Sequence, residues 1–173
     1  WDAHTEQWLE QYFEREVEPV LSPLALDPAR PFPRIQNKSL NFIVRLSGKD
    51  AFGRDAELAV VQVPRSLPRI IRLPQSSSAS ERTHFVFLST VISMFVAQLF
   101  SGMKVDGAWQ FRVTRNSDLF VDDEEVDNLL RAVEGELAQR RYGAAVRLET
   151  SLDCRLDITE FLVRHFALDK ADL

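Results

Sequence analysis

The sequence is poor in cysteine and glycine, and neither residue is arranged as a known site requires. Cys154 is the only cysteine among 173 residues, so the chain cannot form an internal disulfide or supply a Cys cluster for zinc or iron–sulfur. The 6 glycines are scattered and build neither a Gly-x-x-x-x-Gly-Lys phosphate loop nor a Gly-x-Gly-x-x-Gly turn. A reducing, cytoplasmic setting fits this composition best, and nucleotide binding through these two motifs is excluded.

Basic charge and long apolar runs are also scarce. The formal net charge is −5, whereas a duplex-binding surface needs an excess of Lys and Arg. The most apolar stretch, residues 86–100, is interrupted by polar side chains and falls short of the ~20 residues that cross a bilayer. We therefore expect no nucleic-acid partner and no transmembrane segment. Because the first residue is Trp1 and no signal-peptide pattern follows, we interpret the chain as a fragment of a longer protein, which would account for any membrane association.

Reactive residue types are present but do not fall into catalytic patterns. None of His4, His84 and His165 lies three to five residues from another histidine or from the cysteine, so metal-ligand spacing is absent. The acidic run 122–127 could bind a divalent cation, but the charge of a helix N-terminus accounts for it. His165 falls on an apolar helical stripe and is interpreted as structural. The sequence predicts no catalytic, cofactor-binding or metal-binding residue in this chain.

The patterns that are present are those of a globular α+β domain. Apolar residues make up 45% and charged residues 27% of the chain, and the length suits one domain spanning 1–173. Helical spacing predicts helices over 5–21, 88–101, 122–141 and 157–166. Alternation or short apolar runs predict strands over 40–46, 58–63, 109–114 and 146–148. We expect a mixed or antiparallel sheet packed with about four helices, preceded by an entry helix within residues 1–22.

Local signals set several boundaries. Three prolines restrict the segment 64–74 to an edge strand or an extended crossing, and the serine-rich stretch 75–82 is predicted to be a flexible loop. Gly102 stands where a helix C-terminus favours a left-handed residue. Asp157 with Glu160 predicts a capping arrangement for the last helix.

Arginines are the candidate binding residues. They form two groups, Arg65, Arg69 and Arg72 on the proline-fixed segment, and Arg112 and Arg115, before Asn116, on a polar strand face. Guanidinium groups bind phosphate oxygens through bidentate hydrogen bonds. The alternative is that they are solvated or paired with some of the 26 carboxylates. Of the two groups, we interpret only the segment 112–116 as favouring phosphate binding over the alternative.

A series of short motifs runs in order along the chain. It comprises Trp8-Leu9-Glu10-Gln11-Tyr12-Phe13, Val20-Leu21-Ser22-Pro23-Leu24, Phe32-Pro33, Asn37-Lys38-Ser39-Leu40-Asn41, Val61-Gln62-Val63-Pro64, Leu67-Pro68-Arg69, Arg72-Leu73-Pro74, Leu99-Phe100-Ser101-Gly102-Met103, the run Phe111 to Leu119, Arg141-Tyr142-Gly143 and Val146-Arg147-Leu148-Glu149. In this series the chain resembles the head, or middle, domain of bacterial polyphosphate kinases over residues 6–168. The resemblance implies a phox-homology-like fold that contributes to dimer formation.

The resemblance also implies a parent enzyme. That enzyme reversibly transfers the terminal phosphate of ATP to inorganic polyphosphate through a phosphohistidine, with magnesium, and its histidines lie in phospholipase-D-like domains. Those domains carry a His-x-Lys signature, which none of the three histidines here begins. We therefore expect the chain alone to be inactive, with no cofactor of its own, and to work with the remaining domains of the parent, as a homo-oligomer.

Two readings of the binding residues stay open. In the first, the chain is a structural and dimerising domain of the parent enzyme, in which Arg112, Arg115 and Asn116 contact polyphosphate or a neighbouring domain. In the second, the chain is a free-standing anion-binding or protein-interaction module of phox-homology-like fold. The net charge of −5 argues against the second reading.

Overall fold

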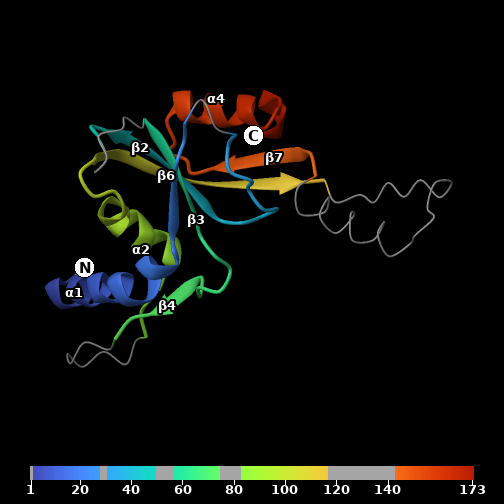
Figure 1. Ribbon diagram of the computed structural model, residues 1–173. Helices are drawn as coiled ribbons and strands as arrows, with labels where there is room; N and C mark the ends of the chain where they lie inside the picture. Colours follow the sequence, from blue (N-terminus) through green and yellow to red (C-terminus); the bar gives the residue numbers. More distant parts are fainter. Residues whose placement is uncertain (1, 28–30, 50–56, 75–82, 117–142) are drawn as a thin grey trace, which may run out of the picture. The chain divides into compact units, whose positions relative to one another are not determined.

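The computed structural model describes residues 2–27, 31–49, 57–74, 83–116 and 143–173 (Figure 1). In these residues five strands form one sheet in the order β1-β3-β2-β6-β7, and two more form a separate sheet, β4-β5. The strands are β1 Ser22–Ala25, β2 Asn41–Ser47, β3 Leu58–Gln62, β4 Ile70–Arg72, β5 Phe85–Phe87, β6 Lys104–Arg115 and β7 Ala145–Thr150. The pairs β1·β3, β4·β5 and β6·β7 run antiparallel, so the predicted α+β class with an antiparallel sheet is confirmed.

Three α-helices occur in the described ranges: α1 Ala3–Tyr12, α2 Leu88–Phe95 and α4 Leu156–His165. Shorter turns of π or 3-10 helix follow as η1 Phe13–Val17, η2 Glu18–Val20, η3 Val96–Leu99 and η4 Lys170–Asp172. The predicted helix over 122–141 and the predicted loop over 75–82 lie outside the described residues. The chain divides into two compact units, which are considered separately below, and the single-domain assignment stays a prediction.

Unit 1 comprises residues 1–31 and 42–109. The entry helix begins at an N-cap, where the Thr5 backbone N–H donates to the Asp2 carboxylate at 2.7 Å. The predicted helix of 5–21 stops being α-helical at Tyr12 and continues as η1 and η2, because Pro19 lacks an amide donor and its ring clashes with the preceding turn. The helical stripe is nevertheless kept. Leu9, Phe13 and Val17 are fully buried, with Phe13 packing against Phe95 of α2 at 5.5 Å between ring centroids.

The sheet of unit 1 combines buried strands with one exposed edge. Residues 42–44 of β2 and 59–61 of β3 are fully buried, as expected for strands inside a sheet, whereas all of β1 is exposed. Leu88, Val91 and Ile92 of α2 complete the core, which confirms the helical stripe read from the sequence. The helix gives way to η3, and Gly102 then takes a φ of +84°, as predicted.

The segment 64–74 of unit 1 contributes only one short strand. Three residues, β4, pair with β5 in a two-stranded ribbon, with Ile71 opposite Val86. Both of these side chains are buried, and prolines 68 and 74 lie just outside the strand. The expected edge strand is therefore confirmed.

Unit 2 comprises residues 32–41 and 110–173. The second half of β6 pairs with β7, with Val113 opposite Leu148, and these two side chains are buried. Ile158 and Leu162 of α4 are buried as well, which gives this unit its own apolar core. The register of β6 against β7 shifts near the end of β6, where a bulge falls between Thr114 and Arg115.

The predicted cap of the last helix is wrong. Helix α4 begins at Leu156, so Arg155 is its N-cap and no side chain caps it. Asp157 is thereby placed inside the first turn, where its carboxylate accepts from Arg155 Nε at 3.1 Å. An acidic side chain at that position still complements the helix dipole, which explains the sequence signal without a capping bond.

Candidate functional site on strands β6 and β7

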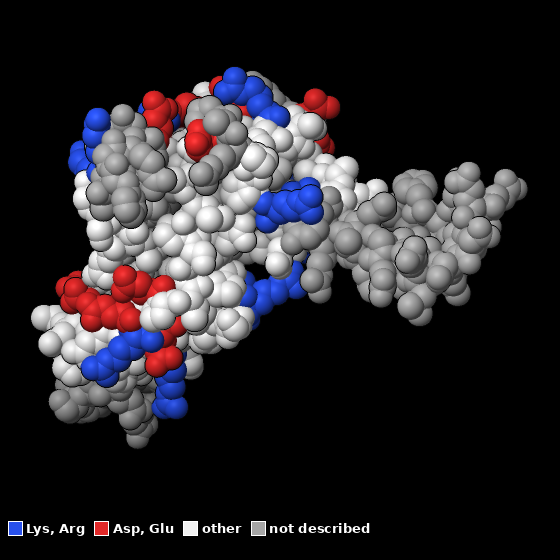
Figure 2. All heavy atoms as spheres, viewed as in Figure 1, with Lys and Arg blue, Asp and Glu red and all other residues white. Residues whose placement is uncertain are grey.

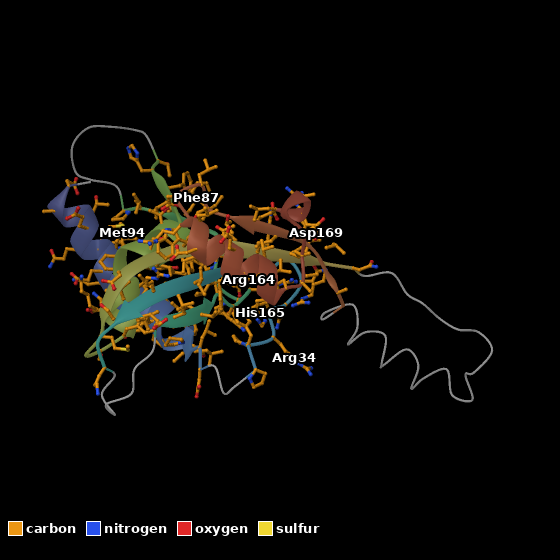
Figure 3. The ribbon with its side chains drawn as sticks, turned by 90° about the horizontal axis from the view of Figure 1, so that it is seen from above. Arg34, Phe87, Met94, Arg164, His165 and Asp169 are labelled. Atoms are coloured by element: carbon orange, nitrogen blue, oxygen red, sulfur yellow. The ribbon has the colours of Figure 1, made fainter. Side chains whose placement is uncertain are left out.

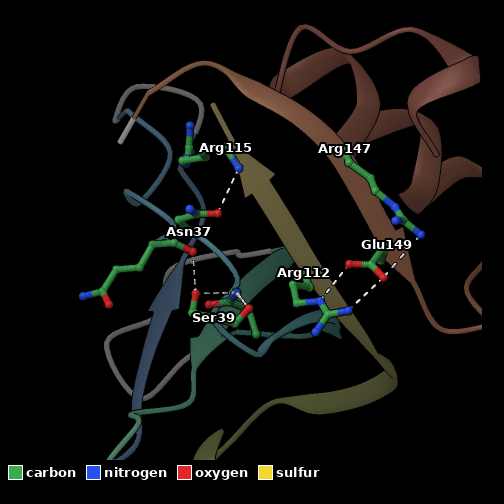
Figure 4. A network of polar contacts seen from close by, with 8 residues as sticks. Asn37, Ser39, Arg112, Arg115, Arg147 and Glu149 are labelled. Carbon is green, nitrogen blue, oxygen red and sulfur yellow. Dashed lines mark hydrogen bonds and ion pairs between the residues drawn. The ribbon is translucent and has the colours of Figure 1, made fainter. Parts of the chain in front are cut away.

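Arg112 forms a bidentate ion pair with Glu149 across the two strands. The residues stand directly opposite each other in the register, and Arg112 Nε and Nη2 donate to the two carboxylate oxygens at 2.7 and 2.8 Å (Figure 4). Hydrogen bonding to Glu149 raises the pKa of Arg112, and the same bonds lower the pKa of the Glu149 carboxyl below its usual range. The predicted candidate Arg112 therefore already holds one anion, the carboxylate of its own sheet.

Two further cations approach the same carboxylate. Arg147 Nη2 lies 3.6 Å from Glu149 Oε1, and the charge of Lys38 also lowers the pKa of Glu149. The Arg112 side chain is 51% exposed and that of Arg147 is 63% exposed. The name cation cluster is used here for Lys38, Arg112, Arg147 and Glu149. The two arginines and Glu149 share one strand face, and Lys38 lies in an exposed turn nearby. The cluster thus carries more positive than negative charge on a solvent-accessible surface. Such a face can accept an additional anion.

Arg115 makes different contacts from Arg112, although the sequence suggested the same role for both. Its guanidinium donates to the carbonyl oxygens of Ile35 at 2.9 Å and Gly143 at 2.8 Å, and lies 5.8 Å from the ring centre of Phe166. Its backbone N–H donates to Asn37 Oδ1 at 2.9 Å (Figure 4). One side chain therefore ties together segments that are far apart in the sequence. Guanidinium geometry suits this, because several donors diverge from one rigid plane.

Asn116 extends β6 by one backbone contact. Its N–H donates to the Ala144 carbonyl oxygen at 2.8 Å, which continues the pairing of β6 with the residue before β7. This contact uses the main chain, so it does not depend on the asparagine side chain. The structure thus brings the three predicted residues into one region of unit 2 and assigns them three different sets of contacts.

The polar turn 36–41 was not predicted as part of this region. Lys38 has a φ of +57°, and its N–H donates to the Val113 carbonyl oxygen at 2.8 Å, which attaches the turn to β6. Ser39 Oγ donates to the Gln36 carbonyl oxygen, and the buried Asn41 amide donates to the carbonyl and hydroxyl oxygens of Ser39. The signal in the sequence was the polar run Asn37-Lys38-Ser39 directly before a strand, which is typical of side chains that bond to nearby backbone.

His165 lies at the end of α4 in an aromatic cluster (Figure 3). Its ring stacks on Phe32 at 4.0 Å and meets the edge of Phe166 at 5.3 Å between centroids. Burial lowers the pKa of His165, and the nearby positive charge of Arg115 lowers it further. These ring contacts agree with the structural interpretation of this histidine, although the residue itself is exposed. His4 and His84 are exposed and belong to the other unit.

The remaining predicted arginines do not form a comparable group. Arg65, Arg69 and Arg72 belong to unit 1, where Arg72 is an exposed residue of β4 and Arg69 supplies a carbonyl oxygen to the Leu88 N–H. The most evident charge of unit 1 is acidic and gathers over α1 (Figure 2). In the part of the chain that is described, no three His, Cys, Asp or Glu side chains lie together as metal ligands.

Comparison with known proteins assigns nearly the whole chain to one family. Residues 4–173 match the family model described as the polyphosphate kinase middle domain. The chain belongs to the polyphosphate kinase family. It is 55% identical over 170 residues to a polyphosphate kinase of Xylella fastidiosa, and 50% identical over 173 residues to one of Pseudomonas aeruginosa. These two matches include 98% and 100% of the chain, but only 24% and 25% of the two relatives.

A solved structure agrees with the fold. The crystal structure of a polyphosphate kinase from Porphyromonas gingivalis matches 99% of the chain and 23% of that protein, with a TM-score of 0.72 and 20% sequence identity. The middle domain thus spans about a quarter of the proteins to which it is similar. In its described residues, no helix has both the length and the apolar content to span a membrane.

Proposed function

We propose that this chain is the structural and dimer-forming head domain of a full-length polyphosphate kinase, with a phox-homology-like fold. The observation that carries this proposal is the match of nearly the whole chain to the middle domain of the family, over only about a quarter of each relative. The parent enzyme transfers the terminal phosphate of ATP reversibly to polyphosphate through a phosphohistidine. A covalent intermediate of this kind splits one difficult phosphoryl transfer into two easier ones.

We assign the reacting groups to parts of the parent enzyme that lie outside these 173 residues. The family resemblance carries no catalytic residue onto any position here, and ATP and magnesium are therefore assigned to the parent enzyme. In unit 2, the end of β6 is tied to the turn 36–41 and to Gly143 by Arg115 and by the backbone of Lys38. A domain placed between others positions them, and small displacements at a phosphoryl-transfer site lower rates strongly.

Polyphosphate synthesis by the separate pieces tests this proposal. The 173-residue chain is supplied with ATP, magnesium and a polyphosphate primer, with the full-length enzyme as the positive control. We expect no synthesis above background from the chain alone, and polymer from the full-length enzyme. Synthesis by the chain alone would overturn the proposal. The dimer is tested by light scattering on the full-length enzyme, where a monomer at all concentrations would remove the dimer-forming role.

Within this function, we propose that the cation cluster contacts polyphosphate or an acidic surface of a neighbouring domain. Its support is the excess of positive charge around Glu149 and the exposure of both arginines. The proposal applies to Arg112 and not to Arg115, since the Arg115 donors are bonded to backbone oxygens. A free-standing anion-binding module is disfavoured, because the close relatives are about four times longer than the chain.

Polymer affinity of full-length variants tests the cluster. The double change Arg112→Gln and Arg147→Gln removes both guanidinium groups and keeps side chains of similar reach. If phosphate is bound here, the affinity for polyphosphate falls and its dependence on salt concentration becomes less steep, because fewer counterions are released. The single change Arg164→Gln, at an exposed arginine of α4, is the matched control. Unchanged affinity together with an unchanged dimer and unchanged activity would dismiss the cluster as a contact.

A further inference from the structure

One face of the β4–β5 ribbon is apolar and exposed. The register places Ile70 opposite Phe87 and Arg72 opposite Phe85, so these four side chains share one face, here called the ribbon face. Ile70 is 56% exposed, Phe85 59% and Phe87 63%, whereas the residues of the opposite face are buried. Phe87 is labelled in Figure 3, directly before α2.

The ribbon does not need these side chains for its own stability. A two-stranded ribbon with one buried face ordinarily carries polar residues on the other, and the buried Ile71 and Val86 already attach this ribbon to its unit. The connection between the strands, residues 75–82, has the composition Gln, Ser, Ala, Glu and Arg and contains no large apolar side chain. Two exposed phenylalanines beside an isoleucine are therefore typical of a contact surface.

The size of the ribbon face favours a contact within one polypeptide. Its three apolar side chains expose on the order of 400 Å², given that a phenylalanine buries roughly 150–250 Å² when fully covered. A stable association of separate molecules buries about 800 Å² on each partner. A smaller surface suffices between tethered parts of one chain, because the linker holds them at a high effective concentration.

We propose that the ribbon face docks onto the part of the same full-length polypeptide that lies outside these 173 residues. The chain spans 24–25% of the relatives that it matches, so about three quarters of such a polypeptide is available to cover it. Arg72 lies on the same face and is exposed, so the docking surface is apolar with a carboxylate or carbonyl group opposite Arg72. This inference rests on the proposed function, in which the chain is one domain of a longer enzyme.

Hydroxyl-radical footprinting of the full-length protein tests the docking directly. Labelling of Phe85 and Phe87, corrected for intrinsic reactivity, is compared with that of the fully exposed Leu152 in the same molecule. We expect both phenylalanines to be labelled about tenfold more slowly than Leu152, at every protein concentration from micromolar to nanomolar. Labelling at the rate of Leu152 overturns the proposal. Protection that disappears on dilution identifies a second copy as the occupant and also overturns it.

Variants of the full-length protein sharpen the test. The triple change Ile70→Thr, Phe85→Thr and Phe87→Thr removes the apolar side chains and places β-branched residues of high strand propensity in the ribbon. Val146→Thr, at an exposed position of β7, is the matched control. Loss of the docked contact is expected to speed protease cleavage between this domain and its neighbours by about tenfold in the triple variant and not in the control. Equal cleavage of both variants and the wild type overturns the proposal. Absence of polyphosphate synthesis by the wild-type protein would count against the proposed function alone, since footprinting does not depend on activity.

Discussion

The two units of the chain are stabilised by different kinds of contact. In unit 1 the buried side chains are almost all aliphatic or aromatic, and they come from a helical stripe and from strands inside the sheet. In unit 2 a smaller apolar core is joined by bonds from side chains to distant backbone, above all those of Arg115. This difference indicates that an apolar core can be predicted from sequence periodicity, whereas the partners of a polar network are known only from the folded chain.

Of the substitutions that distinguish the two units, we expect the largest loss of stability at the core of unit 1. Phe13→Ala removes a fully buried ring that packs on Phe95. We expect a loss of about 3–5 kcal/mol in the free energy of unfolding, because truncation of a buried phenylalanine leaves a cavity. Urea unfolding followed by circular dichroism measures it. Leu152→Ala, at a fully exposed position, is the control, with an expected change below about 0.5 kcal/mol. Equal effects of the two changes would show that η1 does not pack against α2 as described.

A second, smaller effect is expected in the network of unit 2. Arg115→Ala leaves the carbonyl oxygens of Ile35 and Gly143 without this donor, at a cost of about 1–3 kcal/mol in unfolding free energy. Arg115→Lys keeps the charge but not the fork of donors, so it recovers only part of the loss. Thermal unfolding of both variants checks the order. A lysine variant as stable as the wild type would show that the positive charge alone accounts for the stabilisation by Arg115.

The smallest effect concerns the ion pair of Arg112 with Glu149. Removal of one partner costs about 0.5–1 kcal/mol, since the arginine is half exposed and water screens the pair. The folded protein lowers the pKa of Glu149, so its stabilisation is complete above the ordinary glutamate pKa and is lost as the pH falls through the lowered value. Stability measured between pH 7 and pH 3 should therefore fall less in Glu149→Gln than in the wild type. Parallel pH profiles would contradict the pair.

Elements with a strong apolar period were predictable from the sequence. The stripe of Val91 and Ile92, the strands around Val44 and Val60, and the left-handed Gly102 all appear where their patterns placed them. The local capping signal failed at the start of α4. Asp157 was expected to help cap α4, but the helix starts one residue earlier, and the acidic side chain serves the first turn instead.

The candidate site was predictable only in part. Arginines on a polar strand face indicated contacts with phosphate, which stay a prediction. The bidentate pair of Arg112 with Glu149 is the alternative left open by the sequence, in which arginines pair with carboxylates. Arg112 and Arg115 could not be distinguished from the sequence, because their partners are distant along the chain: Glu149 lies 37 residues from Arg112, and Ile35 lies 80 residues from Arg115. Lys38 joins the cluster through a turn with a positive φ, a conformation that a lysine does not signal.

We propose that this domain supplies shape and contacts while phosphate is transferred by residues elsewhere in the parent enzyme. The most direct measurement replaces its three histidines in the full-length protein, as His4→Asn, His84→Asn and His165→Phe, and follows the phosphorylated enzyme formed from radiolabelled ATP. We expect that the phosphohistidine intermediate and polyphosphate synthesis both persist. A folded variant that no longer becomes phosphorylated would contradict it, because a reacting histidine would then lie within this chain.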